Sequence, residues 1–568
     1  MHESFVLSSL RTIFIFLKTT PFSTANRSVF FDQMESQTFD LLVIGGGITG
    51  AGIALDASAR GLKVALVEKQ DFGAGTSSRS TKLIHGGLRY LKQLEIGLVM
   101  EVGREREIVY RNAPHLVIPE KMLLPVIEKG SLSEFSTSIG LYVYDVLAGV
   151  KAGERRKMLS KEQTLKQEPL LRKDILKAGA LYTEYRSDDA RLVIENMKEA
   201  VKRGAVCLNY TRCEGFNYDQ QGKVKAARVT DQISGREVEV KAHYIINAAG
   251  PWVDELREMD KSRQGKRLHL TKGVHIVFPY EKLPFRQAMY FDAPLGRMIF
   301  AIPRDGCTYV GTTDTTYSDQ KERPAVTKED VNYLFQAVNG IIDGVQVQES
   351  DIISSWCGLR PLIHEDGKSP SELSRKDEIF ESASGLLSIA GGKLTGYRKM
   401  SQRIVDKIFD RMSSSQGKAF VACSTHRIPL AGGFESPQAV DQFVELLLGE
   451  SKQINFSREL VIKLVGKYGK NAQTIVELAY EMSRKIHDVE SLATLAELRY
   501  GMAEEMVCTP SDFFIRRSGM LYFNRLDILK HRESVFLWME SHTSLDSSFF
   551  TASKSELEKE LEEVMYFA

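Results

Sequence analysis

The chain has 568 residues, which is too long for one hydrophobic core and predicts two or three domains. Hydrophobic residues make up 43% and charged residues 26%, as in soluble globular proteins. The 75 lysines and arginines nearly balance the 74 aspartates and glutamates, so the net charge of +1 gives no support for nucleic acid as a partner. The six cysteines are scattered, which favours reduced thiols and supports neither a disulfide framework nor a metal site.

The first 38 residues differ from the rest of the chain. They are rich in Ser and Thr and carry three basic residues, a composition that resembles a weak organellar transit peptide. The other interpretation is an extension ahead of a start at Met34, since the first expected strand begins a few residues later. We favour the second interpretation and expect residues 1–38 to be disordered. No apolar run in the chain has the length of a membrane span.

The most informative stretch is a strand–helix–strand pattern. An apolar strand over 41–44 leads into a Gly-x-Gly-x-x-Gly motif over 45–50, and an alanine-rich helix follows. A second apolar strand over 64–67 then ends at Glu68. The helix N-terminus offers unpaired N–H groups and a positive dipole to phosphates. The strands, glycines, helix and acid together predict dinucleotide binding, whereas an ordinary glycine-rich turn would not need the acid.

Each glycine of the motif has an expected role. Gly45 permits a tight turn, Gly47 has no Cβ to block the pyrophosphate, and Gly50 lets the helix pack close to the strand. Glu68 can accept hydrogen bonds from the ribose hydroxyls of the adenosine half.

The later elements follow in chain order. We expect a ligand-wrapping loop over 71–91, helices over 95–111 and 192–203, strands over 214–230 and 236–246, a strand-rich section over 265–315, a strand over 386–390 and a helix over 397–412. The strand-rich section predicts a separate antiparallel sheet that can form a substrate wall. A polar stretch over 413–417 marks a boundary, and the chain beyond 433 is helical. Its last helix is expected to begin with the capping box Ser553-x-x-Glu556.

Five motifs carry a resemblance to a known family. They are Ser77–Leu91, Gly311–Asp314, Gly358–Leu362, Gly391–Lys399 and, in the helical part, Thr509–Arg517. With them, residues 40 to about 410 resemble the FAD-dependent, quinone-linked glycerol-3-phosphate dehydrogenases, and the helical part resembles the cap of Gram-positive bacterial members.

The resemblance implies an α/β fold of the D-amino-acid-oxidase-like class. It has a Rossmann-like FAD-binding domain, an antiparallel substrate-domain sheet and a C-terminal helical domain. The implied organisation is an extension over 1–38, interleaved FAD-binding and substrate domains over 39–412 with the substrate sheet mainly at 265–350, and a helical domain over 424–568.

The resemblance also implies an activity. The chain would oxidise sn-glycerol 3-phosphate to dihydroxyacetone phosphate and pass electrons to a membrane quinone in glycerol catabolism. It would lie on the cytoplasmic face of the cell membrane in weak peripheral contact, or in mitochondria if the extension is a transit peptide, and a homodimer is compatible with this. The alternatives are an amine or amino-acid oxidase of the same fold, or a flavin-containing assembly protein without turnover.

The cofactor implied by the resemblance is FAD, and it is expected to be bound without a covalent link. The residues that would hold it are Gly45, Gly46, Gly47, Gly50, Glu68, Thr76, Ser77, His85, Gly86, Gly87, Ala249, Gly250, Gly391, Gly392, Lys393, Leu394 and Thr395.

Oxidation of a secondary alcohol needs a hydride acceptor, a base and anchors for the substrate. A phosphate dianion calls for cations, and Arg is favoured for its bidentate fork. By resemblance, the substrate is surrounded by Arg89, Tyr90, Arg360, Arg375 and Lys393. A lone arginine is more often a surface residue, but Arg89, Arg360 and Lys393 lie in glycine-flanked loops, which favours a functional role. Four cations also suit a phosphate better than an amino-acid carboxylate.

Two histidines are candidates for acid–base chemistry, because imidazole titrates near neutral pH. His275 alternates with Val274 and Ile276 along a strand, so its side chain can point into a cavity, although a core histidine is the other interpretation. His85 is expected to pack near the flavin ring. The catalytic candidates are therefore His275, Arg360 and Lys393, and an Arg or Lys of lowered pKa stays open as the base.

Three further features suggest structural roles. Trp252 and Trp356 are expected in the core, and the Asp188-Asp189 pair is expected to cap a helix N-terminus.

Overall fold

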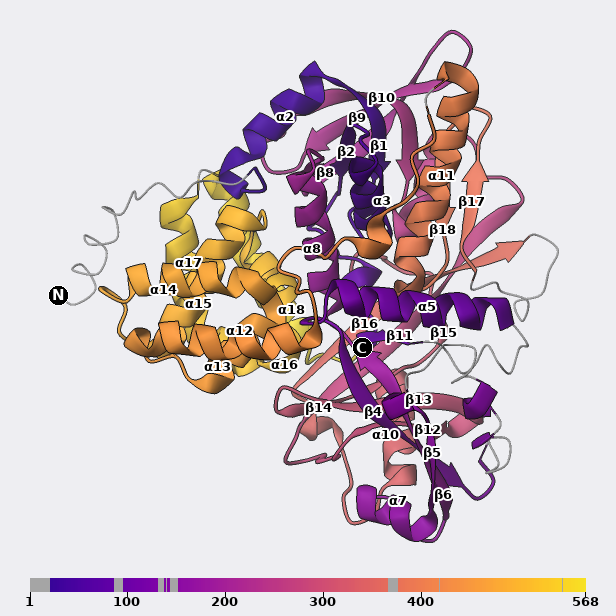
Figure 1. The fold of residues 1–568 in the computed structure, drawn as a ribbon, viewed down its shortest axis with the longest axis vertical. Coiled ribbons are helices and arrows are strands. Elements are labelled where there is room, and N and C mark those ends of the chain that lie inside the picture. Colours follow the sequence, from indigo (N-terminus) through magenta and orange to yellow (C-terminus); the bar gives the residue numbers. More distant parts are fainter. Residues whose placement is uncertain are drawn as a thin grey trace.

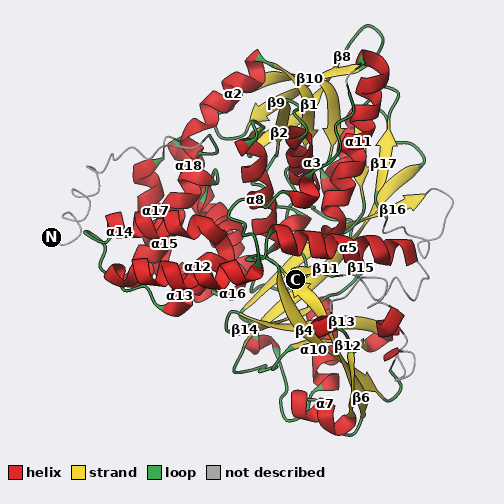
Figure 2. Cartoon of the chain, in the orientation of Figure 1, coloured by secondary structure: helices red, strands yellow, loops and turns green. Residues whose placement is uncertain are grey.

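The structure is a computed structural model that describes residues 21–85, 96–130, 137–138, 140–143, 152–365, 376–417, 419–543 and 545–568. Two β-sheets lie one above the other in the view of Figure 1, and a bundle of C-terminal helices lies beside them. Figure 2 shows that helices cover the upper sheet, while the lower part of the molecule is mainly strands. No helix in the described part of the chain has both the length and the hydrophobicity needed to cross a bilayer.

The first sheet holds the expected strand–helix–strand unit. Its order is β17-β18-β10-β1-β2-β7, and β8 and β9 extend it beside β10. The strands are β1 (Thr38–Ile44), β2 (Val64–Val67), β7 (Val206–Leu208), β8 (Thr211–Tyr218), β9 (Val224–Asp231), β10 (Glu237–Asn247), β17 (Glu378–Glu381) and β18 (Leu387–Ala390). β1 pairs in parallel with both β2 and β10, so the ends of these strands meet at one edge of the sheet.

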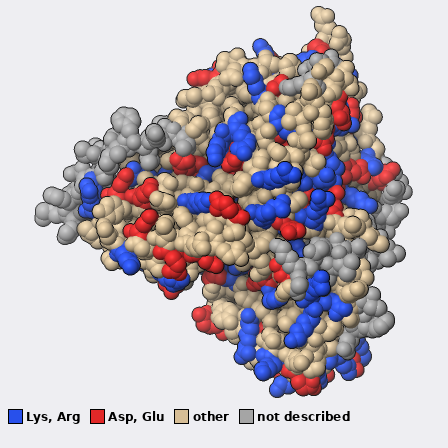
Figure 3. All heavy atoms as spheres, viewed as in Figure 1, with Lys and Arg blue, Asp and Glu red and all other residues tan. Residues whose placement is uncertain are grey.

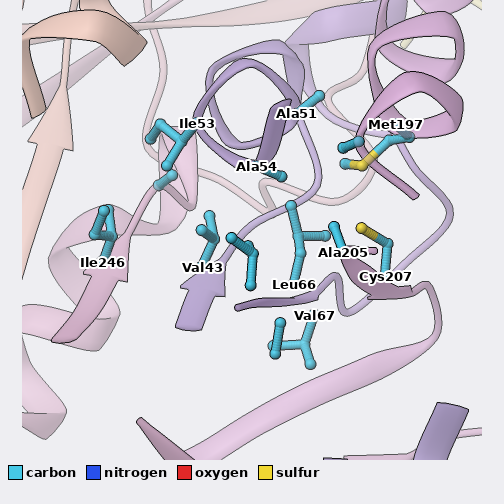
Figure 4. Packing of buried hydrophobic residues seen from close by; sticks show 14 of the residues in the cluster. Val43, Ala51, Ile53, Ala54, Leu66, Val67, Met197, Ala205, Cys207 and Ile246 are labelled. Carbon is cyan, nitrogen blue, oxygen red and sulfur yellow. The ribbon is translucent and has the colours of Figure 1, made fainter. Parts of the chain in front are cut away.

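Several helices cover the first sheet, and the packing of α3 (Ile48–Ala59) among them explains the apolar pattern of the sequence. α3 lies against α8 (Asp189–Lys202) and α11 (Tyr397–Gln416). Figure 4 shows Ala54 of α3 facing the side chains of the strands below, while Ala51 of α3 lies on the side of Met197 of α8. The small residues on α3 allow the helix to approach the strands closely. Because these strands are buried on both faces, their sequences are continuous apolar runs.

The second sheet lies below the first sheet in the view of Figure 1. Its strands are β3 (Leu83–Ile84), β4 (Ile118–Ile127), β5 (Lys157–Ser160), β6 (Leu176–Arg186), β11 (Lys266–Pro279), β12 (Ala288–Ala293), β13 (Arg297–Arg304), β14 (Cys307–Gly311), β15 (Thr315–Thr316) and β16 (Ser354–Glu365). Its described pairs are antiparallel except β12 with β4. The sheet thus draws on strands well before the expected 265–350.

Further helices lie around the sheets and in the C-terminal region. Around the sheets are α2 (Arg27–Ser36), α5 (Ile96–Asn112), α7 (Lys161–Gln167), α9 (Val253–Met259) and α10 (Lys328–Ile341). The C-terminal region holds α12 (Pro437–Glu450), α13 (Arg458–Tyr468), α14 (Ala472–Met482), α15 (Val489–Glu504), a π-helix (Asp512–Arg517), α16 (Met520–Phe523), α17 (Arg525–His542) and α18 (Ser547–Glu563). The expectation of a helical C-terminal region is therefore confirmed.

Two expected helix boundaries differ from the structure. α18 begins at Ser547, because the Asp546 carboxylate accepts hydrogen bonds from the N–H groups of Ser548 and Phe549. Ser553 therefore lies inside the helix and does not cap it. The polar stretch after 412 continues α11 to Gln416, and the helix ends at Gly417, whose φ of 64° gives the left-handed terminus.

The N-terminal segment from residue 21 is folded, which differs from the expected disorder through residue 38. Phe30, Phe31 and Met34 of α2 are buried, and Arg27 forms a buried ion pair with Asp231 at 2.7 Å. One of the three basic residues that suggested a targeting peptide is thus neutralised inside the protein, and the apolar residues of α2 pack on the first sheet.

A buried ion network joins the first sheet to the helical region. Asp71, in the loop after β2, accepts hydrogen bonds from Arg516 and Arg517 of the π-helix and from Asn209. Burial alone would raise the pKa of Asp71, but the Arg517 and Arg516 guanidiniums outweigh that effect and hold the pKa below its usual value. The network is therefore ionic in the folded protein.

Among the described residues, the face of the molecule seen in Figure 3 has no large patch of charges of one sign. Figure 3 shows Lys and Arg interspersed with Asp and Glu over this face, in agreement with the net charge of +1.

Candidate functional site

A cavity of about 1310 Å³ is lined by residues from both sheets. Fifteen of the residues expected from the sequence lie on its wall, namely Gly45, Gly47, Glu68, Thr76, Ser77, His85, Ala249, Gly250, His275, Arg360, Gly391, Gly392, Lys393, Leu394 and Thr395. Gly46 and Gly50 lie behind the wall, while Gly86, Gly87, Arg89, Tyr90 and Arg375 fall outside the described residues.

The glycine loop at the end of β1 is shaped by close backbone contacts. Gly45 has a φ of 116°, and a Cβ there would lie 2.5 Å from the carbonyl oxygen of Ala248. A Cβ on Gly50 would lie only 1.9 Å from the carbonyl oxygen of Gly45. This geometry matches the tight turn and the close helix–strand packing expected for the motif.

Glu68 and Ser77 fix the polar lining beside this loop. The Glu68 carboxylate accepts hydrogen bonds from the N–H groups of Gly46, at 2.7 Å, and Gln70, at 2.9 Å. Burial raises the pKa of Glu68, and these two donors oppose that shift. Ser77 Oγ accepts from the N–H of Ile48 at 3.0 Å, in the first turn of α3 where a pyrophosphate would bind.

His85 and Thr395 join two segments that are far apart in the sequence. The His85 N–H donates to Thr395 Oγ1, and that hydroxyl donates to the His85 carbonyl, each at 3.1 Å. The His85 ring contacts Phe300 of the second sheet edge to face. The expected cofactor segments around residues 85 and 395 therefore meet on one wall of the cavity.

Arg360 on β16 is held by the motif at 311–314. Its guanidinium donates to the Thr313 carbonyl at 3.0 Å, to Thr312 Oγ1 at 2.9 Å and to Asp314 at 3.3 Å. On the facing strand, a Cβ on Gly273 would lie 2.4 Å from this guanidinium. Lys393, half-buried at the end of β18, lines the same cavity.

His275 is buried, with 2% of its surface exposed. Its ring stacks on Trp356 with centroids 4.7 Å apart, and Nε2 lies 3.0 Å from Thr81 Oγ1. Burial, and then the positive charges of Arg360 and Lys82, lower the pKa of His275 well below its ordinary value. The imidazole is therefore neutral at neutral pH.

Three cavity residues were given no functional role in the sequence interpretation. Trp252 was expected in the core but is half-buried on the cavity wall, where its Nε1 donates to Glu322 at 2.8 Å. Lys69 lies over the Trp252 ring and forms an ion pair with Glu322 at 2.6 Å. The position of Lys69 directly after Glu68 could have indicated from the sequence that it lies near the cofactor site. Glu322 comes from a distant loop, and nothing in the sequence indicates its place in the cavity.

Two structural expectations hold. Trp356 is buried in the core, and the Asp188 carboxylate accepts from the Arg191 N–H as the N-cap of α8.

Comparison with known proteins defines the class. Residues 40–398 match the family model for FAD-dependent oxidoreductases, and residues 423–548 match that for the C-terminal domain of α-glycerophosphate oxidase. The structure of L-α-glycerophosphate oxidase from Mycoplasma pneumoniae with FAD bound shares the fold, with a TM-score of 0.54 at 19% identity over 66% of this chain and 95% of that chain.

The particular group follows from closer relatives. Aerobic glycerol-3-phosphate dehydrogenase of Staphylococcus aureus (strain USA300) is 49% identical over 547 residues, which are 96% of this chain and 98% of that protein. The glycerol-3-phosphate dehydrogenase from Bacillus halodurans, solved in complex with FAD, is similar with a TM-score of 0.83 and 44% identity, over 96% of this chain and 99% of that chain. The chain belongs to the FAD-dependent glycerol-3-phosphate dehydrogenases.

FAD is the cofactor of this family member, and the residues present suit it. The tight turn at Gly45 brings the backbone to the cavity, and the N-terminus of α3 faces it. The fixed carboxylate of Glu68 retains acceptor capacity for ribose hydroxyls.

Replacing Gly50 by alanine should weaken FAD binding roughly tenfold or more, because the new Cβ would force the Gly45 carbonyl out of place. The measurement is the FAD dissociation constant from flavin fluorescence. Gly340→Ala is the control, because a Cβ at Gly340 in α10 meets no atom within 4 Å. Equal FAD affinity in the two variants would contradict the role given to Gly50.

Proposed function

We propose that the enzyme oxidises sn-glycerol 3-phosphate to dihydroxyacetone phosphate. The observation that carries the proposal is the placement of Arg360, Lys393 and His275 on the wall of the cavity that also contains the dinucleotide loop. Guanidinium and ammonium groups suit a phosphate dianion, and a neutral imidazole suits the proton of an alcohol. Bound FAD supplies the acceptor for the hydride from C2.

Each residue has a proposed role in this reaction. Arg360 binds the phosphate or the developing alkoxide, and its contacts with the 312–314 loop hold the guanidinium in one orientation. Lys393 supplies a second positive charge from the opposite sheet. We extend the substrate set to Arg89, Tyr90 and Arg375 by family resemblance. His275 takes up the hydroxyl proton.

Anaerobic addition of sn-glycerol 3-phosphate should bleach the visible absorbance of the flavin, because reduced flavin loses that absorbance. Glycine and D-alanine serve as matched additions, since an amino-acid oxidase of the same fold would respond to them. Bleaching by an amino acid and not by sn-glycerol 3-phosphate would replace the proposal with the oxidase. No bleaching by any of the three would support a flavin-containing assembly protein.

We further propose that the electrons pass to a membrane quinone. A quinone dissolved in a bilayer requires its reductase to reach the membrane surface, and peripheral contact through apolar or basic residues can provide this. The proposed location is the inner face of the cell membrane. This part of the function is supported by family membership and not by a contact in the structure.

The protein should float with liposomes and be released from them by high salt or detergent, because weak peripheral contact depends on exposed charge and apolar area. Turnover should rise when quinone is included in the vesicles. Vesicles without quinone are the control for the turnover assay. A protein that stays unbound, and whose turnover ignores quinone, would contradict this proposal and leave the chemistry at the cavity intact.

A further inference from the structure

His275, the proposed proton acceptor, is poorly accessible from the cavity. The side chain is 2% exposed, and its Nδ1 is covered and has no hydrogen-bond partner among the described residues. Trp356 covers one face of the ring, and Gly311 approaches the ring so closely that a Cβ there would lie 2.1 Å from its Cδ2. The remaining nitrogen, Nε2, is engaged by Thr81. A substrate hydroxyl therefore has restricted access to either ring nitrogen.

Thr81 is more accessible than His275. It is half-buried, lines the cavity and places Oγ1 3.0 Å from His275 Nε2. A threonine hydroxyl can donate one hydrogen bond and accept another at the same time. It can thus contact a ligand hydroxyl in the cavity while it remains bonded to the imidazole.

The chain around Thr81 is fixed by a buried carboxylate. Asp189 accepts from the Ser80 N–H at 3.0 Å and from Ser80 Oγ at 2.7 Å. Lys82 Nζ donates to the same carboxylate at 2.6 Å. Both neighbours of Thr81 are therefore tied to one group at the start of α8, which restricts the backbone that carries the hydroxyl.

The second sheet fixes the same segment from the other side. Trp356 Nε1 donates to the Ser80 carbonyl at 3.1 Å, and the Tyr309 hydroxyl donates to the Thr81 carbonyl at 3.0 Å. Trp356 is also the residue that stacks on His275. One aromatic side chain thus sets the position of the imidazole and of the threonine relative to each other. Catalytic groups held by such surrounding contacts react without reorganisation.

We propose that the Thr81 hydroxyl relays the proton between the substrate hydroxyl and His275 Nε2. The proposal rests on the proposed function, because it assigns the path of the proton in that oxidation. The substrate O–H bond breaks as its proton moves to Thr81 Oγ1, and the Thr81 proton moves to His275 Nε2. The C2 hydrogen leaves with its electron pair as hydride to the acceptor that the cofactor supplies, and the C2–O bond becomes a carbonyl.

The charges around the pair are consistent with this relay. Burial, and then the positive charges of Arg360 and Lys82, disfavour an imidazolium in the resting protein, so Nε2 can be unprotonated there. When a phosphate dianion binds near Arg360, its negative charge offsets that repulsion. Bound substrate thus makes proton uptake by His275 less unfavourable than it is in the resting protein.

The test compares three variants with the wild type. Thr81→Val keeps the shape and removes the hydroxyl, Thr81→Ala removes it with less volume, and Thr81→Ser restores it. The rate constant of flavin reduction by sn-glycerol 3-phosphate is measured anaerobically by stopped flow, with FAD content measured in each protein. Thr81→Val and Thr81→Ala should be slower by about 10²-fold or more, and Thr81→Ser should stay close to the wild type.

A second measurement needs no turnover. In protein labelled with ¹⁵N at histidine, the Nε2 signal of His275, assigned with a His275→Gln variant, should shift in Thr81→Val and remain near its wild-type position in Thr81→Ser. This readout reports the Thr81–His275 hydrogen bond directly.

The outcomes separate the relay from the proposed function. Slow reduction in the Val and Ala variants, rescue by Ser and a shifted Nε2 signal support the relay. If the wild type is reduced by sn-glycerol 3-phosphate and Thr81→Val keeps pace with it, the relay is overturned and the function stands. If the wild-type flavin is not reduced by this substrate, the proposed function fails, and the relay fails with it.

Discussion

Replacing Asp71 by asparagine should lower the free energy of unfolding by about 3–5 kcal/mol, the loss expected when one partner of a buried ion pair is removed. Asp71 is 1% exposed. Its carboxylate accepts one hydrogen bond from Arg516 and two from Arg517, and the two from Arg517 measure 2.7 and 3.0 Å. A neutral amide at this position would remove the negative charge that Arg516 and Arg517 share, and both guanidiniums would stay buried.

Urea unfolding followed by circular dichroism and by flavin fluorescence would measure the effect. Asp174→Asn is the matched control, because Asp174 pairs with Arg172 on the exposed surface and should leave the unfolding midpoint unchanged. Flavin release should precede loss of secondary structure in Asp71→Asn, since the loop that carries Asp71 continues into the cavity lining at Ala74. The same midpoint for both variants would show that the network contributes nothing to stability.

The second large effect is expected at the proposed anion site. Arg360→Ala should lower kcat/KM for sn-glycerol 3-phosphate by roughly one to two orders of magnitude, because a charge-assisted contact contributes about 1.5–3 kcal/mol. FAD content should stay normal, since the described contacts of Arg360 are with the 272–314 region of the second sheet. Steady-state kinetics with FAD quantified for each preparation would measure both.

Arg172→Ala provides the comparison for Arg360→Ala. It removes a guanidinium from an exposed pair with Asp174 and should leave kcat/KM unaltered. Arg360→Lys should recover part of the activity through its charge but not the bidentate geometry. Unchanged kinetics in Arg360→Ala, or loss of flavin in place of activity, would remove Arg360 from the substrate site.

Local patterns explain the parts of the fold that could be predicted. The unit from β1 to β2 needs only an apolar strand, glycines at fixed spacing and a helix, so its signal lies within 30 residues. The side chain of Asp188 caps its own helix and could also be identified locally. Such features do not depend on where the rest of the chain folds.

The expectations that failed depended on distant partners. Arg27 contributes to a composition that resembles a leader peptide. Its charge is neutralised by Asp231, some 200 residues later in the sequence, and that partner cannot be identified locally. Trp252 is a typical core residue by type, but Lys69 and Glu322 hold it at the cavity wall. The contact of Arg360 with the 312–314 loop was not expected, since spacing along the chain does not show which strands pair.

The π-helix explains why two consecutive arginines can serve one carboxylate. In a regular α-helix, neighbouring residues do not face the same side. The wider π turn over Asp512–Arg517 allows both Arg516 and Arg517 to reach Asp71. π-turns are rare and occur often at functional sites, and here one forms the ionic contact between the helical region and the loop beside the cofactor cavity.

The folded N-terminal segment has a consequence for biosynthesis. Ser23 and Thr24 donate hydrogen bonds to the carbonyls of Met502 and Val507, which follow them by 479 and 483 residues. A ribosome adds about 5–20 residues each second, so this segment stays without these partners for roughly 25–100 seconds of synthesis. The fold therefore joins the earliest part of the described chain to a segment that is synthesised much later.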